Sequence, residues 1–256
     1  MTGRDEYYNR AKQEGYRARS AYKLQQLDGT ANLFDDGDTV VDLGAAPGGW
    51  LQVAAEEVGP QGKVVGVDLQ RIDDLDAHQV STIPGDMTED ETRDRLRREL
   101  GGAEADVVIS DMAPNMTGEY ELDHARSVHL ARTAYETATE FLKPGGDFVA
   151  KVFQGKDLED LEADIEESFQ YVRRVNPEAS RDSSSEIYLV AKGYTTAPVA
   201  EGDQLTVEIT DTGEEGDGIA KVESFTVFVA GAEEGEDVEV RITDVKPNFA
   251  FAERVD

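Results

Sequence analysis

Between residues 39 and 193 the chain alternates short apolar runs, rich in β-branched residues, with longer segments of helical periodicity. Continuous apolar strands separated by helices are typical of a mostly parallel sheet that is covered on both faces. The pattern predicts an α/β, Rossmann-like fold, with the last two strands close enough in sequence to form an antiparallel hairpin at the sheet edge. The expected strands are residues 39–43, 63–68, 79–84, 105–110, 147–153, 171–175 and 187–192, and the expected helices are residues 49–58, 89–100, 120–142 and 158–169.

The periodicity changes after residue 196, where apolar residues alternate with polar ones and no helical pattern follows. Short alternating strands between Gly, Glu and Asp turns are typical of a small all-β barrel. We therefore expect two domains, residues 1–196 and residues 197–256. The side chains expected inside the barrel are Leu205, Val207, Ile209, Phe225, Val227, Val229, Val238, Val240 and Ile242.

The chain is strongly acidic, with 55 Asp and Glu against 25 Lys and Arg and a net charge of −30. Taken alone, that charge argues against a polyanionic partner such as RNA. Because the acids are spread along the whole chain, we favour adaptation to a salt-rich cytoplasm, which makes the protein halophilic. Near 1 M salt the Debye length is only about 3 Å, so long-range repulsion of RNA is screened. RNA binding would then rest on direct contacts, because counterion release adds little.

The composition also narrows the other classes of site. The absence of cysteine excludes disulfides and thiolate metal sites, and the histidines His78, His124 and His129 are too scattered to suggest a metal cluster. No apolar run is long enough to span a membrane, and the N-terminus lacks a signal region. We expect a cytoplasmic monomer that holds no metal and binds no membrane.

The first 27 residues depart from the acidic pattern and carry a net charge of +3. Bases interleaved with aromatic residues suit phosphate contacts and base stacking, although a helix with a solvated basic face is the alternative. By contrast, Arg93, Arg95, Arg97 and Arg98 are surrounded by acids, so we expect a solvated helix face there. The N-terminal segment contains Arg4, Arg10, Lys12, Arg17, Arg19 and Lys23, the acids Asp5, Glu6 and Glu14, and the tyrosines Tyr7, Tyr8, Tyr16 and Tyr22.

A glycine-rich turn follows the first expected strand, where residues 42–50 are Asp-Leu-Gly-Ala-Ala-Pro-Gly-Gly-Trp. Its spacing is neither that of a dinucleotide-binding loop nor that of a P-loop. Acids follow the next strands: Asp68 suits the hydroxyls of a ribose, Asp86 suits an adenine amino group, and Asp111 follows the fourth strand. Any one of these acids, or Asp42, could instead cap a turn or helix. Together they favour a nucleoside ligand without phosphates, namely S-adenosylmethionine.

Four polar residues suggest reaction chemistry: Lys23, Asp111, Lys151 and Glu186. Lys151 lies inside an apolar strand, where a lysine is costly unless it is paired or used. A strand-end lysine that extends its ammonium group into water is the alternative.

Residues 11–24, 42–50, 110–118 and 183–192 resemble the RlmE (FtsJ/RrmJ) family, in the family's order and over about residues 4–193. The resemblance implies methylation, with S-adenosylmethionine, of the ribose 2′-oxygen of a uridine in the A-loop of 23S ribosomal RNA. It places the catalytic set on Lys23, Asp111, Lys151 and Glu186. It places the cofactor contacts on Gly48, Trp50, Asp68, Asp86 and Asp111.

The residue types agree with this chemistry, since a 2′-hydroxyl is a poor acid and a basic partner helps to remove its proton. Lys151 could accept that proton if Lys23 and partial burial lower its pKa, with Asp111 and Glu186 orienting the two lysines. Lys151 could alternatively only orient the oxygen.

Residues 197–256 resemble a TRAM domain, an OB-like barrel that binds RNA. It could supply RNA with Lys221, Arg241, Lys246 and aromatics such as Phe228 or Phe249, although most of these phenylalanines are expected in the barrel core. The implied partner is large-subunit ribosomal RNA or the ribosomal subunit. Two alternatives are a 2′-O-methyltransferase acting on tRNA and a ribosome-assembly factor that binds RNA without turnover.

Overall fold

The computed structural model describes residues 3–181, 184–213 and 216–255, with the first described side chain at Glu6. The side chains of Arg4 and Asp5 and residue 183, which the sequence analysis includes, lie outside this described part. The chain divides into two compact units, Met1–Lys192 and Gly193–Asp256. This division falls within the last strand of the first unit, a few residues before the boundary expected at residue 196.

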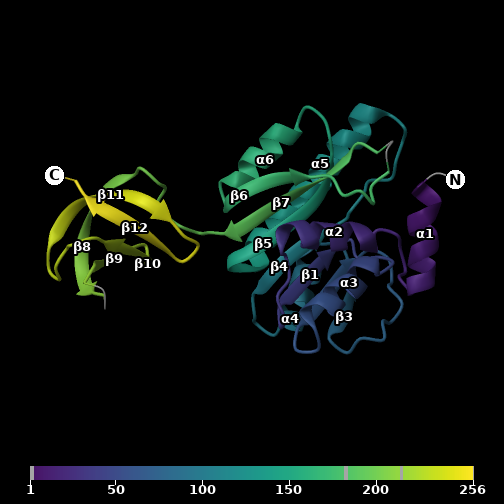
Figure 1. Cartoon of the computed structure of the whole chain (residues 1–256), viewed down its shortest axis with the longest axis horizontal. Helices are drawn as coiled ribbons and strands as arrows, with labels where there is room; N and C mark the ends of the chain where they lie inside the picture. Colours follow the sequence, from purple (N-terminus) through teal and green to yellow (C-terminus); the bar gives the residue numbers. More distant parts are fainter. Residues whose placement is uncertain (1–2, 182–183, 214–215, 256) are drawn as a thin grey trace. The chain divides into compact units, whose positions relative to one another are not determined.

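The first unit is built on a seven-stranded sheet with strand order β3-β2-β1-β4-β5-β7-β6 (Figure 1). Strands β1 to β5 run parallel to one another, and β7 is antiparallel to β5. The predicted mostly parallel sheet, with the last two strands together at one edge, is thus confirmed. The strands are β1 (Thr39–Leu43), β2 (Lys63–Asp68), β3 (Val80–Pro84), β4 (Ala105–Ser110), β5 (Leu142–Phe153), β6 (Phe169–Val175) and β7 (Glu186–Tyr194).

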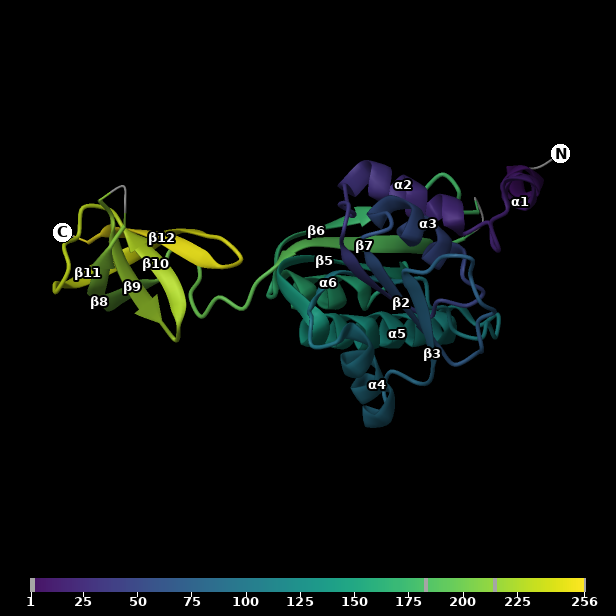
Figure 2. The ribbon, with the colours of Figure 1, turned by 90° about the horizontal axis from the view of Figure 1, so that it is seen from below.

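Helices cover both faces of this sheet, as predicted (Figure 2). Helices α2 (Ala21–Ala31) and α3 (Gly49–Val58) lie on one face. Helices α4 (Asp90–Leu100), α5 (Tyr120–Phe141) and α6 (Leu158–Glu166) lie on the other. Helix α1 (Gly3–Glu14) precedes them and is separated from α2 at Gly15, whose φ of 84° favours glycine.

Helix α4 shows why the arginines near residue 95 have a structural role. Acids occupy its first turn and Arg97 and Arg98 its last turn, where each sign of charge complements the helix dipole. Arg93 and Arg97 both form ion pairs with Glu140 of α5, and Arg95 donates to the carbonyl of Pro84. These side chains are therefore engaged within the protein.

The connection from β2 to β3, residues 69–79, contains no helix. In a doubly wound sheet, consecutive parallel strands are usually joined by a crossover helix. Here an irregular segment lies beside α3 in place of that helix. This segment directly follows Asp68, at the carboxyl end of β2.

The second unit is a closed barrel with strand order β10-β12-β11-β8-β9. Its core contains the inward-facing Val and Ile residues predicted from the alternation, while Leu205 and Phe225 are partly buried. Strands β10 and β12 are parallel, whereas β9 pairs antiparallel with β10 and with β8, and β11 pairs antiparallel with β12 and with β8. The strands are β8 (Gln204–Thr212), β9 (Gly218–Val222), β10 (Phe225–Val229), β11 (Asp237–Val245) and β12 (Phe249–Arg254).

The expectation that most barrel phenylalanines lie in the core is wrong. Phe228, Phe249 and Phe251 contact one another, with ring centroids 5.4 to 5.9 Å apart, and Phe251 is 40% exposed. The pleat explains this, because the neighbouring Val227, Val229, Ala250 and Ala252 fill the core and alternate residues must point outward. We call Phe228, Phe249 and Phe251 the aromatic patch.

Among the described residues, no helix is both long and apolar enough to cross a membrane. In the same part of the chain, no three His, Asp or Glu side chains gather in a way that could hold a metal ion.

Candidate active site

The four residues expected to react come from four separate elements that meet beside β5. Lys23 lies on α2, Asp111 directly follows β4, Lys151 lies in β5, and Glu186 begins β7. Because β7 is antiparallel to β5, its first residue, Glu186, pairs with Phe153 near the end of β5. The topology therefore brings the start of β7 to the carboxyl edge of the sheet, where ligands of such folds bind.

Two ion pairs connect these residues. Lys23 Nζ lies 2.5 Å from Glu186 Oε1, and Lys151 Nζ lies 2.9 Å from Asp111 Oδ1. Lys151 also donates to the backbone carbonyl of Asp111 at 2.5 Å. The Lys151 side chain is only 7% exposed, so it is not a strand-end lysine that reaches into water. Each buried ammonium group has its own carboxylate, which offsets the cost of burial.

Tyr188 links the two pairs, although it is not among the site residues predicted from the sequence. Its hydroxyl donates to Asp111 Oδ1 at 2.7 Å, and its ring centroid lies 5.7 Å from Lys23 Nζ. Burial, together with the negative charge of Asp111, raises the pKa of Tyr188 well above its ordinary value, so the hydroxyl remains a donor at neutral pH. The sequence spacing could have indicated Tyr188 as a site residue, because residues two apart in a strand lie on the same face and Tyr188 is two residues after Glu186.

The glycine-rich turn between β1 and α3 has the backbone expected of a ligand cradle. Gly44 and Gly48 have φ values of 78° and 106°, a region that favours glycine. A Cβ on Gly44 would come within 2.4 Å of the Met112 side chain, so a larger residue does not fit. Trp50 is buried and donates its indole N–H to the carbonyl of Ser20 at 2.8 Å, which ties α3 to the start of α2.

Asp68 is held between this turn and the connection that follows β2. Its Oδ2 accepts from the backbone N–H of Ala46 at 3.0 Å, and its Oδ1 accepts from that of Gln70 at 2.7 Å. Asp68 therefore has a fixed orientation at the end of β2, as a carboxylate that receives ribose hydroxyls requires.

Asp42 and Asp86 differ from each other in their surroundings. Asp42 lies inside β1 and is fully buried, and neither carboxylate oxygen has a hydrogen-bond partner. Burial, with smaller contributions from Asp111 and Asp68, raises the pKa of Asp42 well above its ordinary value. Asp86 Oδ1 accepts from the backbone N–H and hydroxyl of Thr88, which lowers its pKa and closes a turn before α4. The alternative of a turn-closing acid therefore describes Asp86 in this structure.

The basic N-terminal segment is engaged mainly with the protein itself. The rings of Tyr7 and Tyr16 pack against Tyr22 at 5.4 and 5.7 Å, and Tyr22 is buried. Arg10 lies over the Tyr22 ring and pairs with Glu14. Three of the four tyrosines thus pack within the protein, whereas Tyr8 is 62% exposed and available to a partner.

A Rossmann-like sheet with a glycine-rich turn after β1 and an oriented acid after β2 is the arrangement of an α/β domain that binds a nucleoside-containing ligand. A family model described as FtsJ-like methyltransferase matches residues 16–194, and a TRAM domain model matches residues 198–255. The chain belongs to the FtsJ-like methyltransferase family and carries a C-terminal TRAM domain. The family implies a methyl donor of the S-adenosylmethionine type.

Similar proteins span nearly the whole chain. A protein of Halorubrum lacusprofundi named Ribosomal RNA large subunit methyltransferase E is 68% identical over 100% of this chain and 95% of its own length. A Methanosarcina mazei protein of the same name is 49% identical over 98% of this chain and 92% of its own length. A Plasmodium falciparum crystal structure described as a ribosomal RNA methyltransferase is 27% identical, with a TM-score of 0.63, over 70% of this chain and 98% of that one.

Proposed function

We propose that this protein transfers a methyl group from S-adenosylmethionine to the ribose 2′-oxygen of a uridine in the A-loop of 23S ribosomal RNA. The observation that carries the proposal is the pair of buried contacts Lys23–Glu186 and Lys151–Asp111, joined through Tyr188. The names of the curated relatives, which specify large-subunit ribosomal RNA, support the substrate class.

The residues at the turn fit the cofactor. Gly44 and Gly48 give the turn a backbone with positive φ that other residues rarely adopt, and Asp68 is already oriented at the end of β2 by the N–H groups of Ala46 and Gln70. The residues that would hold the cofactor are Gly48, Trp50, Asp68, Asp86 and Asp111. When bound, the cofactor supplies an electrophilic methyl group on a sulfonium.

Lys151 is the residue that positions the ribose oxygen in this proposal. The proton of the 2′-hydroxyl passes to solvent water as the methyl group replaces it, and a buried ammonium group with a fixed carboxylate partner stabilises the negative charge that develops on the oxygen. Asp111 accepts from both Lys151 and Tyr188, so it keeps the ammonium group in place. In this proposal the Lys23–Glu186 pair, whose ammonium group lies over the Tyr188 ring, orients the ribose.

The barrel contributes RNA binding through the aromatic patch. Thr226 pairs with Phe249 and Phe228 pairs with Phe251, so the three rings share the outer face of β10 and β12. Lys221 donates to Thr226 on the same face, which places a cation beside the rings. Stacking of a base on an aromatic side chain contributes about 1–3 kcal/mol and survives high salt, which screens phosphate contacts.

The test is methyl transfer at high salt from labelled S-adenosylmethionine to large-subunit ribosomal RNA, to isolated large subunits and to tRNA, followed by mapping of the modified ribose. We expect one modified uridine in the A-loop of the large-subunit RNA. The proposal would be refuted if only tRNA were modified. It would also be refuted if the protein bound these RNAs but transferred a methyl group to none of them.

A further inference from the structure

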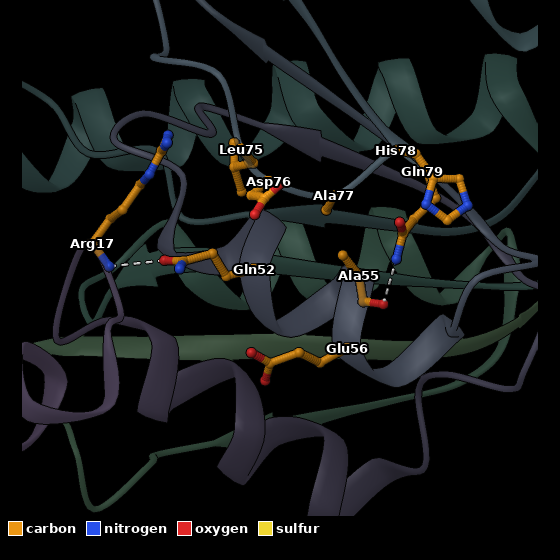
Figure 3. A pocket seen from close by; sticks show the side chains of 9 residues that line it. All are labelled: Arg17, Gln52, Ala55, Glu56, Leu75, Asp76, Ala77, His78 and Gln79. Atoms are coloured by element: carbon orange, nitrogen blue, oxygen red, sulfur yellow. Dashed lines mark hydrogen bonds between the residues drawn. The ribbon is translucent and has the colours of Figure 1, made fainter.

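The connection between β2 and β3 (residues 69–79) lies between two pockets. One pocket, of about 540 Å³, separates the connection from α3 and extends from Arg17 to His78 (Figure 3). The other, of about 370 Å³, lies between the start of the connection and the end of β3, where Gln70, Ile72 and Thr82 contribute to its wall. The connection packs against the core of the first unit through Ile72, Leu75 and Ala77, and it borders a pocket on each side.

Arg17 supports the middle of this connection. Its guanidinium donates to the backbone carbonyls of Asp73 and Asp74, both at 2.6 Å, and to that of Pro47 at 3.2 Å. Of the hydrogen bonds in the described part of the chain, those that reach residues 71–76 all come from Arg17. Arg17 thus joins the connection to the glycine-rich turn by hydrogen bonds, and the Ile72 side chain lies against the same turn, 3.5 Å from where a Cβ on Gly48 would be.

Arg17 is itself fixed on α3. Its backbone N–H donates to Gln52 Oε1 at 2.8 Å, and Gln52 Nε2 donates to the carbonyl of Gly15 at 3.0 Å (Figure 3). The guanidinium also packs on the turn, because a Cβ on Gly48 would lie 3.1 Å from Arg17 Nη1. The bond from the Arg17 backbone to Gln52 and the bonds from its side chain to three carbonyls together fix the position of the planar guanidinium.

We infer that Arg17 is a positioning residue for the cofactor and not a phosphate contact for RNA. It holds the connection against the glycine-rich turn and so maintains the smaller pocket. The wall of that pocket includes Gln70, two residues after Asp68, and Pro84, two residues before Asp86, and these two acids are the ones expected to receive the ribose and the adenine. Three of the five N–H donors of Arg17 are committed to backbone carbonyls, which fixes the guanidinium on the connection and leaves at most two donors for a phosphate. This inference rests on the proposed function, because it assigns the adenosine end of the cofactor to that pocket.

The experiment compares Arg17→Ala and Arg17→Lys with Lys12→Ala, which removes an exposed cation from the same basic segment. Calorimetry gives the Kd for S-adenosylmethionine, anisotropy gives the Kd for A-loop RNA without cofactor, and hydrogen exchange reports on residues 69–77. For Arg17→Ala we expect the cofactor Kd to rise roughly 10- to 100-fold, as charged hydrogen bonds of this kind imply, with faster exchange in the connection. The RNA Kd should stay within about twofold.

Arg17→Lys keeps the charge but not the fork, so we expect a smaller rise in the cofactor Kd and the same unchanged RNA Kd. This variant also decides the matter if Arg17→Ala does not fold. Weaker RNA binding with an unchanged cofactor Kd would overturn the inference and make Arg17 an RNA contact. If the wild-type protein binds S-adenosylmethionine but methylates no RNA, the proposed function fails, while the effect of Arg17 on cofactor affinity can still be measured.

Discussion

Removal of Glu186 should destabilise the first unit strongly, because Lys23 would lose its carboxylate partner. The two side chains are 11% and 12% exposed and lie 2.5 Å apart, so water cannot replace the missing oxygen easily. Breaking a buried ion pair by deleting one partner costs roughly 3–5 kcal/mol. The remaining exposure favours the lower end, so for Glu186→Ala we expect a loss of about 3 kcal/mol in the free energy of unfolding.

The assay uses Trp50, the single tryptophan of the chain, which is buried with its ring 5.8 Å from that of Tyr188. Its fluorescence reports unfolding of the first unit without a contribution from tryptophan in the barrel. In a unit of this size, about 3 kcal/mol corresponds to a decrease in Tm of roughly 6–12 °C. The measurement is made at constant high salt, where a buried pair is screened little.

Asp164→Ala is the matched control, because it removes one partner of the Arg132–Asp164 pair between α5 and α6. That pair is as close, at 2.6 Å, but its side chains are 38% and 44% exposed. Exposed pairs contribute about 0–1 kcal/mol, and solvent screening reduces this further. Equal changes in Tm for Glu186→Ala and Asp164→Ala would refute the view that burial makes the Lys23–Glu186 pair important.

Three further predictions concern the site and the barrel. Lys151→Ala should abolish methyl transfer and leave the Kd for S-adenosylmethionine within about threefold. The cofactor affinity should change little because, of the residues expected to bind the cofactor, the Lys151 ammonium group contacts only Asp111. Near-normal single-turnover rates would contradict this prediction. Asp42 has a raised pKa in the folded protein, so its own contribution to the free energy of unfolding should fall as pH rises above its unfolded pKa of about 4, with a limiting slope of about 1.4 kcal/mol per pH unit. Asp42→Asn should remove that decline in urea unfolding, and a pH dependence identical to wild type would count against the raised pKa. Phe251→Ala should weaken RNA binding by about 1–3 kcal/mol in anisotropy without changing cofactor affinity, and an unchanged RNA Kd would argue against the aromatic patch.

Much of the fold could be predicted because local periodicity and tertiary burial agree. The strand β1, the helix α3 and the turn between them follow from an apolar run, two glycines and a helical pattern. The alternation in the barrel predicted its core for the same reason, since each Val or Ile on one face is buried.

The strand β5 shows where local signals were insufficient. Residues 143–146, Lys-Pro-Gly-Gly, favour a turn, and the sequence analysis began this strand at residue 147. In the structure β5 begins at Leu142, which pairs with Ala105 of β4 before a shift in register. Pairing with a neighbouring strand therefore outweighed local preference.

Contacts between distant elements were also beyond local periodicity. Nothing near Tyr188 in the sequence indicates a bond to Asp111, because their proximity depends on the antiparallel insertion of β7 beside β5. Arg17 was grouped with RNA-binding cations by its charge, whereas its partners are backbone carbonyls, which every residue has and no sequence pattern distinguishes.

Each lysine of the site, Lys23 and Lys151, pairs with one carboxylate, so the two pairs together carry no net charge within a chain of net charge −30. Both pairs are largely buried, so dissolved salt screens them little, whereas the acids spread over the surface repel one another through solvent and are screened by salt. Lowering the salt concentration would therefore increase repulsion among the surface carboxylates and destabilise the folded state, while the two buried pairs keep their contacts. Inactivation on desalting should accordingly follow global unfolding and be reversed when salt is restored, with the chemistry of the centre unaltered.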